Sequence, residues 1–383
     1  MSKQKQLGRP PLPPELKRDK KLSLNDEEYA LIRSWREDGV IPTSHAIKSD
    51  QGVERLRETR NALKHRYQQA LQELEEANKR VEIIDELQDR AREKLHQIAK
   101  IAQLNETAAI MVGGDWHVEE NVDPTTVNWK NIYNLKEAAT RAKNFFAGGL
   151  EWIELIRSKS KVDRLILALL GDIITGYIHE EYIEDNNLSP TEATIFAQDL
   201  ICSGIDFLLK EGKMKEIIIP CMVGNHGRTT AQKRIATSYK NSFEWLMYKT
   251  LGRIYKGNNR VIFVIENGYH TYLKVNDNYT IRFHHGDAVK YKDGVGGVTI
   301  PMNKAIAQWN KSKYANLDVF GHFHQHIDGG NFIANASLIG YNAFAIKIRA
   351  GYEEPQQTFF IIDKDRGKMM VAPIFVRDME KKS

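Results

Sequence analysis

Five short clusters place ligand-type side chains directly after apolar runs in this sequence. The apolar run at 217–223 ends in Gly224-Asn225-His226. Runs of this kind predict buried strands, and α/β sheets usually hold ligands at the carboxyl ends of their strands. Four other clusters follow the same rule: Gly114-Asp115-Trp116-His117, Gly171-Asp172, His284-His285-Gly286-Asp287 and Gly321-His322-Phe323-His324. Five such clusters in one chain would rarely arise by chance.

These clusters contain the residue types that bind divalent metal ions. The candidate ligands are Asp115, His117, Asp172, Asn225, His285, His322 and His324. Carboxylate and amide oxygens suit hard cations, and histidine nitrogen suits manganese, iron and zinc. A carboxylate can also bridge two ions, because each oxygen binds one. The set predicts two divalent ions, most simply Mn²⁺, with iron, zinc or magnesium as alternatives. The two cysteines, Cys202 and Cys221, are too few for a disulfide framework or a cysteine-based zinc site.

Two metal ions at about 3.5–4 Å from each other are the standard arrangement for hydrolysing phosphate esters. Such a reaction needs one further group that does not bind metal. It must stabilise the charge on phosphorus or protonate the leaving oxygen. His226 follows the candidate ligand Asn225 and is placed for this role. Arg228, two residues further on, could bind the phosphate of the substrate.

Each candidate has a simpler interpretation when it is taken alone. An aspartate before a glycine turn is usually a turn residue, and a core histidine is usually just hydrogen-bonded. Only the joint order of the clusters favours a metal site. Because side chains alternate along a strand, only one of His284 and His285 can face the metals, and His285 beside Gly286 fits better. His179 and His326 lie outside the pattern, so we expect structural or substrate-side roles.

The order Asp-x-His, Gly-Asp, Gly-Asn-His, His-Gly and Gly-His-x-His resembles the calcineurin-like metallophosphoesterase superfamily over residues 108–330. The segments 224–228 and 294–297 look similar to members encoded by phages and mobile elements. The resemblance implies a four-layer αββα sandwich. It also implies specific roles: Asp115, His117 and His324 on the first metal, Asn225, His285 and His322 on the second, Asp172 as the bridge, and His226 as the catalytic histidine that binds no metal.

Two positions depart from that family pattern. Many members carry an acidic residue after Gly-Asn-His, where this chain has Gly227-Arg228. The double-strand-break repair exonucleases of the superfamily carry a histidine where this chain has Thr175. The chain therefore departs from that exonuclease subclass, while nuclease activity remains an expectation.

Short apolar strands alternate with amphipathic helices from residue 107 onward, which predicts an α/β catalytic domain over 105–383. Strands are expected at 108–112, 165–170, 217–223, 261–265, 271–275, 280–284 and 318–320, and helices at 129–158, 190–210 and 234–251. Segments 332–336, 344–348, 358–362 and 369–375 are expected to add strands of a second sheet. The glycine-rich segment 294–297 lacks the lysine of a phosphate-binding loop, so we expect a flexible rim near Lys290 and Lys292.

Residues 51–104 predict one long helix with a heptad repeat. When Val53 is taken as position a, twelve of the fourteen a and d positions up to Ile98 are apolar. Such a helix is too long to bury its apolar stripe against one small domain, so we expect a homo-oligomer formed through a coiled coil. The alternative is a helix that folds back over the catalytic domain.

The amino-terminal region suggests a nucleic-acid partner. Residues 1–22 are proline-rich and hold seven basic and two acidic residues, an excess that equals the net charge of +5 of the whole chain. A basic arm of this kind can bind phosphates, DNA in preference to RNA. Residues 23–50 predict a small helical segment and a candidate helix-turn-helix. The sequence has no apolar run of membrane-spanning length, so we expect a cytoplasmic location and no membrane partner.

Together these features favour a metal-dependent phosphodiesterase or nuclease acting on nucleic acid. Two alternatives remain. The first is a small-molecule or protein phosphatase, whose activity would survive removal of residues 1–100. The second is a DNA-binding adaptor in which the phosphoesterase domain is largely structural, and the complete ligand set argues against it.

Overall fold

The computed structural model describes residues 33–34, 58–72, 107–158, 160–290, 297–347 and 349–378 of the 383-residue chain. Contacts divide the chain into two units, Met1–Arg90 and Ala91–Ser383. In the first unit, residues 58–72 form a helix on which only Leu63 is half-buried and all other side chains are exposed. The basic arm lies outside the described residues, as do most of 23–50 and of the predicted coiled coil. Self-association therefore stays a prediction.

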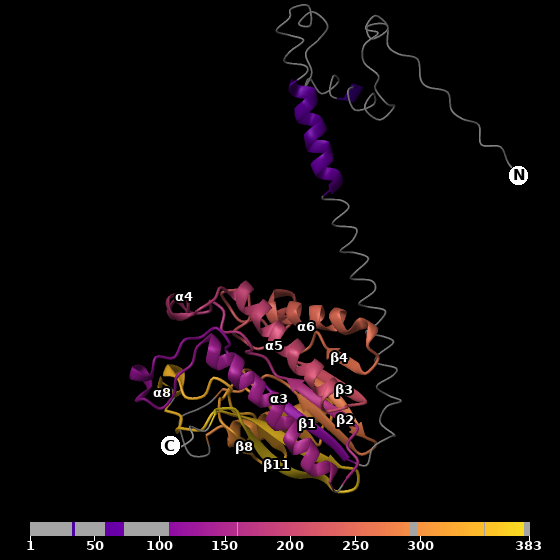
Figure 1. Ribbon diagram of the computed structural model, residues 1–383, viewed down its shortest axis with the longest axis vertical. Helices are drawn as coiled ribbons and strands as arrows, with labels where there is room; N and C mark the ends of the chain where they lie inside the picture. The colour runs from indigo at the N-terminus through magenta and orange to yellow at the C-terminus, as the bar shows by residue number, and fades with distance from the viewer. Residues whose placement is uncertain are drawn as a thin grey trace, which may run out of the picture. The chain divides into compact units, whose positions relative to one another are not determined.

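The second unit is built on two mixed β-sheets (Figure 1). In the six-stranded sheet, β1 (Thr107–Gly113), β2 (Arg164–Leu169), β3 (Glu216–Cys221) and β4 (Val261–Ile265) are parallel neighbours. β10 (Gln356–Asp363) pairs antiparallel with β1, and β11 (Gly367–Phe375) pairs antiparallel with β10. The carboxyl ends of the four parallel strands therefore lie along one edge of this sheet.

The five-stranded sheet has the order β5-β6-β7-β9-β8. β6 (Tyr279–Phe283), β7 (Leu317–Phe320) and β9 (Phe332–Ala334) are parallel. β5 (Thr271–Asn276) and β8 (Ile327–Asp328) pair antiparallel with their neighbours at the two ends. The carboxyl ends of β6 and β7 carry two of the histidine clusters.

Helices cover the outer faces of the two sheets. α3 (Leu135–Arg157), α5 (Pro190–Lys210) and α6 (Phe243–Ile254) share one apolar core with the six-stranded sheet. α7 (Thr299–Ser312) packs on the five-stranded sheet through a smaller core. The shorter helices are α4 (Glu180–Asp185), α8 (Ala343–Lys347) and the 3₁₀ turns η2 (Pro124–Val127), η3 (Ser238–Asn241) and η4 (Tyr255–Gly257).

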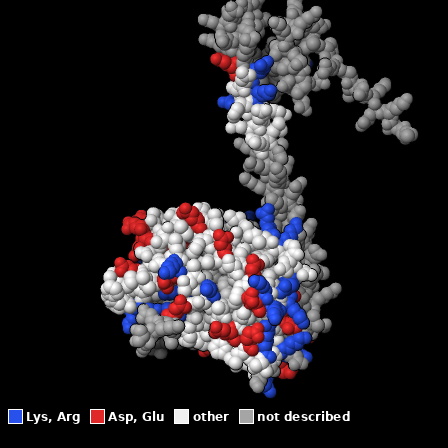
Figure 2. Space-filling view, viewed as in Figure 1, with Lys and Arg blue, Asp and Glu red and all other residues white. Residues whose placement is uncertain are grey.

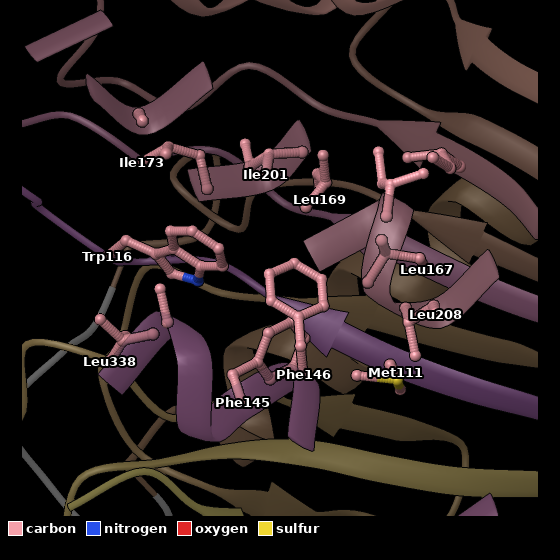
Figure 3. Packing of buried hydrophobic residues seen from close by; sticks show 14 of the residues in the cluster. Met111, Trp116, Phe145, Phe146, Leu167, Leu169, Ile173, Ile201, Leu208 and Leu338 are labelled. Atoms are coloured by element: carbon pink, nitrogen blue, oxygen red, sulfur yellow. The ribbon is translucent and has the colours of Figure 1, made fainter. Parts of the chain in front are cut away.

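Side-chain alternation along β1 explains how the layers pack. Ala109 and Met111 point into the core shared with the helices, where Phe145 and Phe146 of α3 surround the buried Trp116 (Figure 3). The Trp116 ring lies 5.9 Å from that of Phe145, edge to face. The residues between them, such as Ile110, point into a second core that lies between the two sheets. Each large apolar side chain buried in this way stabilises the fold by about 1.5–3 kcal/mol. The packed layers therefore hold the strand ends rigidly.

The structure confirms a mixed α/β fold but corrects some of the predicted elements. Residues 344–348 were expected as a strand, yet Ala343–Lys347 form α8. The Asn342 side chain accepts a hydrogen bond from Ala345 N (3.1 Å), which starts the helix, and a five-residue apolar run cannot distinguish the two structures. The strands at 358–362 and 369–375 were assigned to the second sheet. They belong to the first, because β10 pairs along the free edge of β1.

The predicted helices begin later than their apolar periodicity suggests. α3 begins at Leu135 rather than 129, because Asn134 accepts hydrogen bonds from Lys136 N and Glu137 N. α6 begins at Phe243 rather than 234, and its N-cap is Ser242. The prediction of α5 at 190–210 is confirmed. α7 at 299–312 lies where the sequence patterns predicted no helix.

Candidate metal centre

The loops that follow the strands have an unusual backbone conformation at the candidate ligands. Positive φ angles occur at Asp115 (52°), His117 (48°), Asp172 (49°), His322 (72°) and His324 (55°). Residues other than glycine rarely adopt this left-handed conformation, which costs about 1–3 kcal/mol and persists where surrounding structure enforces it. Five such residues at neighbouring strand ends indicate that the fold holds these side chains in place for a function.

A first group of ligand-type atoms comes from the ends of β1 and β7. The ligand atoms of Asp115, His117 and His324 all lie within 4.8 Å of one another. Asp115 has no exposed surface, and its Oδ2 accepts a hydrogen bond from His322 N (2.9 Å). This is the set of three that the family resemblance implies for the first metal.

A second group comes from the ends of β2, β6 and β7. The ligand atoms of Asp172, His285 and His322 also lie within 4.8 Å of one another. His285 Nε2 is 2.9 Å from Asp172 Oδ2 and 3.1 Å from the amide oxygen of Asn225. The structure thus brings together the four residues that the resemblance implies for the second metal and the bridge.

His226 lies beside both groups. Its ligand atom is within 4.8 Å of those of His117 and Asp172. Its Nδ1 is 3.0 Å from the carbonyl oxygen of Thr175, and because a carbonyl can only accept, Nδ1–H must donate. This hydrogen bond fixes the tautomer and leaves Nε2 as the nitrogen available for chemistry. Its backbone N–H donates to Asp172 Oδ1 (2.7 Å), which ties His226 to the centre of the site.

Burial and repulsion from neighbouring histidines lower the pKa of two candidate ligands, His117 and His322. Burial lowers the pKa of His117, and the neighbouring His226 and His324 lower it further. The pKa of His322 falls to about 4 through burial and the charge of His285. These side chains are therefore neutral at pH 7, which is the form that binds metal.

The carboxylate Asp172 behaves in the opposite way. Burial alone would raise its pKa, but His285 and His226 lower it well below its ordinary value. Asp172 in turn raises the pKa of the buried His285. The result is an ionised carboxylate at the point where the two groups of ligands meet.

The donor set fits two divalent cations. His117 Nε2 and His324 Nδ1 are buried nitrogens without a hydrogen-bond partner, and such atoms are rare in native structures unless they face a ligand. The other nitrogen of His117, Nδ1, lies 3.2 Å from Thr175 Oγ1, and His285 Nδ1 donates to Leu170 O (2.7 Å). Partners of this kind orient histidines that bind metal. Both groups of ligands are therefore oriented for a cation.

Two buried glutamates that the sequence analysis missed hold the loops of the site. Glu244 Oε1 accepts from Ile173 N and Glu244 Oε2 accepts from Gly224 N, both at 2.6 Å. Glu119 Oε1 accepts from Thr175 N and Gly176 N, both at 2.8 Å. Burial raises the pKa of Glu244 to about 8 and that of Glu119 to about 7. Glu119 lies two residues after His117, but nothing in the sequence pattern distinguishes Glu244.

Two glycines of the predicted clusters are required by close contacts. A Cβ atom on Gly224 would overlap Oδ1 and Cγ of Asp172. A Cβ atom on Gly321 would overlap Oδ2 of Asp115. The glycines in Gly-Asn-His and Gly-His-x-His therefore allow the carboxylates to approach the backbone of the neighbouring loop.

The structure places Arg228 against the backbone of the candidate ligand Asn225, outside the cavity over the histidines. Its guanidinium donates to the carbonyl oxygens of Asn225 (2.5 Å) and Thr230 (3.0 Å). It lines a separate small hollow with Lys233 and Arg234 rather than the cavity over the histidines. Arg228 therefore fixes the loop that carries Asn225. Of the predicted lysine rim, Lys290 is exposed, and Lys292 with residues 294–296 lies outside the described residues.

The remaining histidines occupy different places. His284 is buried against Trp309 and Phe320, with ring centroids 5.1 Å away in each case, and points away from His285. His326 Nδ1 lies 3.2 Å from Thr358 Oγ1. His179 lines the cavity over the site.

A cavity of about 880 Å³ opens over the candidate ligands. Ile178 and Tyr182 near or within α4 form one wall, and Phe344 and Lys347 of α8 form another. The α4 wall is acidic, because Glu181, Glu184 and Asp185 line it. Figure 2 shows acidic side chains gathered over the region where Figure 1 labels α4.

Comparisons with known proteins leave the function to be argued from the site. No family model and no curated protein matches the sequence. Among solved structures, the chain is similar to a dimetal phosphatase from Danio rerio at 10% identity, with a TM-score of 0.31, over 70% of this chain and 99% of that chain. A likeness at this level carries no argument about fold or chemistry. Among the described residues, no helix is both long and apolar enough to cross a bilayer.

Proposed function

We propose that this protein is a metal-dependent phosphoesterase that holds two divalent cations. The observation that carries the proposal is the pair of ligand groups, Asp115–His117–His324 and Asp172–His285–His322, within one rigid edge of the fold. Asn225 completes the second group, and Asp172 lies between the two. Assignment to the calcineurin-like metallophosphoesterases, including the phage type, is part of the proposal, and so is manganese as the ion.

Bound cations of this kind act as Lewis acids, lower the pKa of a water and neutralise charge on the phosphoryl oxygens. The protein's own side chains then have distinct roles. His226, held through Nδ1–H by Thr175 O, would give the leaving oxygen a proton from Nε2 in its doubly protonated form, which the proton lost by the attacking water restores. Thr175 also orients His117, and Glu244 holds the loops that carry Asp172 and Asn225. The preorganised side chains reduce the reorganisation needed during reaction.

The walls of the cavity favour a phosphoester of modest size. Glu181, Glu184 and Asp185 on α4 repel a polyanion at short range, and across the cavity Lys347 is the lysine in the lining. A second candidate is a phosphodiester in nucleic acid, DNA in preference to RNA. The basic excess within residues 1–22 of the sequence favours it. Under that candidate the arm, rather than the cavity wall, binds the polymer.

One activity panel tests both candidates. Protein loaded with Mn²⁺ is assayed on p-nitrophenyl phosphate, bis-p-nitrophenyl phosphate, single-stranded DNA, duplex DNA and RNA, with His226→Ala as the control. The proposal predicts turnover of at least one ester, lost in the control. A chain without residues 1–22 should keep its activity on small esters and lose activity only on polymers if the arm binds nucleic acid. No turnover of any ester would refute the proposal.

A further inference from the structure

Tyr182 occupies a position in the cavity that neither the ligand groups nor the role of His226 explains. It belongs to α4 and lines the cavity of about 880 Å³ over the site. Its ring centroid lies 5.5 Å from that of His226, and His226 lies in turn 4.7 Å from the candidate ligand His117. His226 therefore lies between Tyr182 and the candidate ligand His117.

The hydroxyl group of Tyr182 is available as a hydrogen-bond donor. No described residue forms a hydrogen bond with this hydroxyl group. Burial, with added effects from Glu120, Glu181 and Asp172, raises the pKa of Tyr182 above its ordinary value. The phenol therefore keeps its proton throughout the pH range in which an esterase would be assayed. Tyr182 is half-buried on the wall of the cavity, so its hydroxyl is open to a bound substrate.

The position of this donor indicates which part of the substrate it meets. A phosphoryl group bound at the ligand groups lies within reach of His226, whose ligand atom is within 4.8 Å of those of His117 and Asp172. The organic group of the ester then extends into the cavity, and one path runs past His226 along the α4 wall. Tyr182 lies on that path, beside the histidine that is proposed to serve the leaving oxygen.

We propose that Tyr182 is a catalytic residue whose hydroxyl donates a hydrogen bond to the leaving-group oxygen of the substrate. The inference rests on the proposed phosphoesterase function. As water oxygen bonds to phosphorus, the bond from phosphorus to the leaving oxygen breaks, and its electron pair stays on that oxygen. Tyr182 stabilises the developing charge without giving up its proton. Doubly protonated His226 gives the leaving oxygen its Nε2 proton, and the proton that the attacking water loses restores the doubly protonated form. The interaction strengthens as the charge grows, so it lowers the barrier.

The test compares Tyr182→Phe with the wild type on two esters of the same phosphate, one with p-nitrophenol and one with phenol as the leaving group. The phenol ester gains more from a donor, because phenolate is the poorer leaving group. We expect kcat to fall about 10- to 100-fold for the phenol ester, as for the loss of a hydrogen bond to a charged group, and clearly less for the p-nitrophenyl ester. The matched control is Tyr177→Phe, an exposed tyrosine three residues before α4 that does not line the cavity.

One further measurement separates the explanations. Calorimetric binding of inorganic phosphate to the Mn²⁺-loaded variant should equal that of the wild type, because phosphate has no leaving group. Weaker phosphate binding, or an equal loss of kcat for both esters, would overturn the leaving-group assignment. An unchanged kcat for both esters would overturn any catalytic role for Tyr182. If the wild type hydrolyses no ester of the activity panel, the proposed function fails first, and this outcome is distinct because it appears without any variant.

Discussion

Glu244 offers a sharp test of how the site is held together. Its side chain has no exposed surface, and its two oxygens each accept one short backbone hydrogen bond, from Ile173 N and from Gly224 N. The first loop carries Asp172 and the second carries Asn225. One carboxylate therefore sets the spacing of two loops that bring ligands to the same centre.

Glu244→Gln removes one of the two acceptor oxygens of the carboxylate, and Glu244→Ala removes both. An unsatisfied buried N–H costs about 1–3 kcal/mol. We therefore expect Glu244→Gln to lower the free energy of unfolding by about 1–3 kcal/mol, and Glu244→Ala by about 2–5 kcal/mol, because it also leaves a cavity. Mutation of residues that hold metal ligands in place typically lowers metal affinity by about 10- to 100-fold. We expect Mn²⁺ affinity to fall by that factor in both variants.

The assays are urea unfolding of metal-free protein, followed by tryptophan fluorescence, and calorimetric titration with Mn²⁺. Metal-free protein is needed because bound metal would itself stabilise the fold. The matched control is Glu192→Gln, since Glu192 also accepts a backbone hydrogen bond, from Ser189 N, but is exposed at the start of α5. The control should bind Mn²⁺ as the wild type does. Wild-type Mn²⁺ affinity in Glu244→Ala would refute the claim that this carboxylate positions the ligand loops.

Three further predictions follow from the described contacts. Gly224→Ala and Gly321→Ala should each lose bound metal on elemental analysis, because the new Cβ atom overlaps Asp172 or Asp115, respectively. The control Gly257→Ala should keep its metal, because a Cβ atom at that position meets open space. Metal retained in the first two variants would contradict the packing. His226→Gln should lose about 10²–10⁴ in kcat yet keep two ions per chain, and the loss of one ion would make His226 a ligand instead. Burial and nearby His284 lower the pKa of His270 to about 3, below its unfolded value of about 6.5. Protonation therefore favours the unfolded chain, and urea unfolding should show stability falling as the pH drops below 6.5, less steeply in His270→Gln; an equal slope would contradict this.

The ligand positions could be predicted because each follows an apolar run directly. A strand that ends in a polar residue places that residue at the edge of its sheet, whatever the rest of the fold does. Asp115, Asp172 and His285 are all found at such edges. Parallel strands bring Asp115 and Asp172 to one edge of the six-stranded sheet, but His285 follows a strand of the other sheet, so its place beside them also depends on how the two sheets pack.

The supporting residues could not be predicted in this way. Glu244 bonds to residues 71 and 20 positions earlier in the chain, and no local pattern encodes such a contact. Tyr182 lies on a helix of six residues that has no apolar repeat to reveal it. Arg228 was expected at the phosphate because of its charge. Its geometry depends on nearby carbonyl groups, such as Thr230 O, that compete for its donors.

The errors in secondary structure have the same origin. The run at 344–348 was too short to separate helix from strand, and Asn342 decides the outcome by capping α8. The sheet to which β10 belongs depends on which edge strand is free to pair, and β1 provides that edge. Both outcomes are decided by contacts distant in the sequence or by a single side chain, so residue periodicity cannot reveal them.

The central claim is that two cations share Asp172. Electron paramagnetic resonance of the protein loaded with two equivalents of Mn²⁺ tests it most directly, because two manganese ions joined by a carboxylate are magnetically coupled. We predict the spectrum of a coupled pair in the wild type and its loss in Asp172→Ala. A wild-type spectrum of isolated Mn²⁺ ions, or binding of only one ion per chain, would contradict the claim.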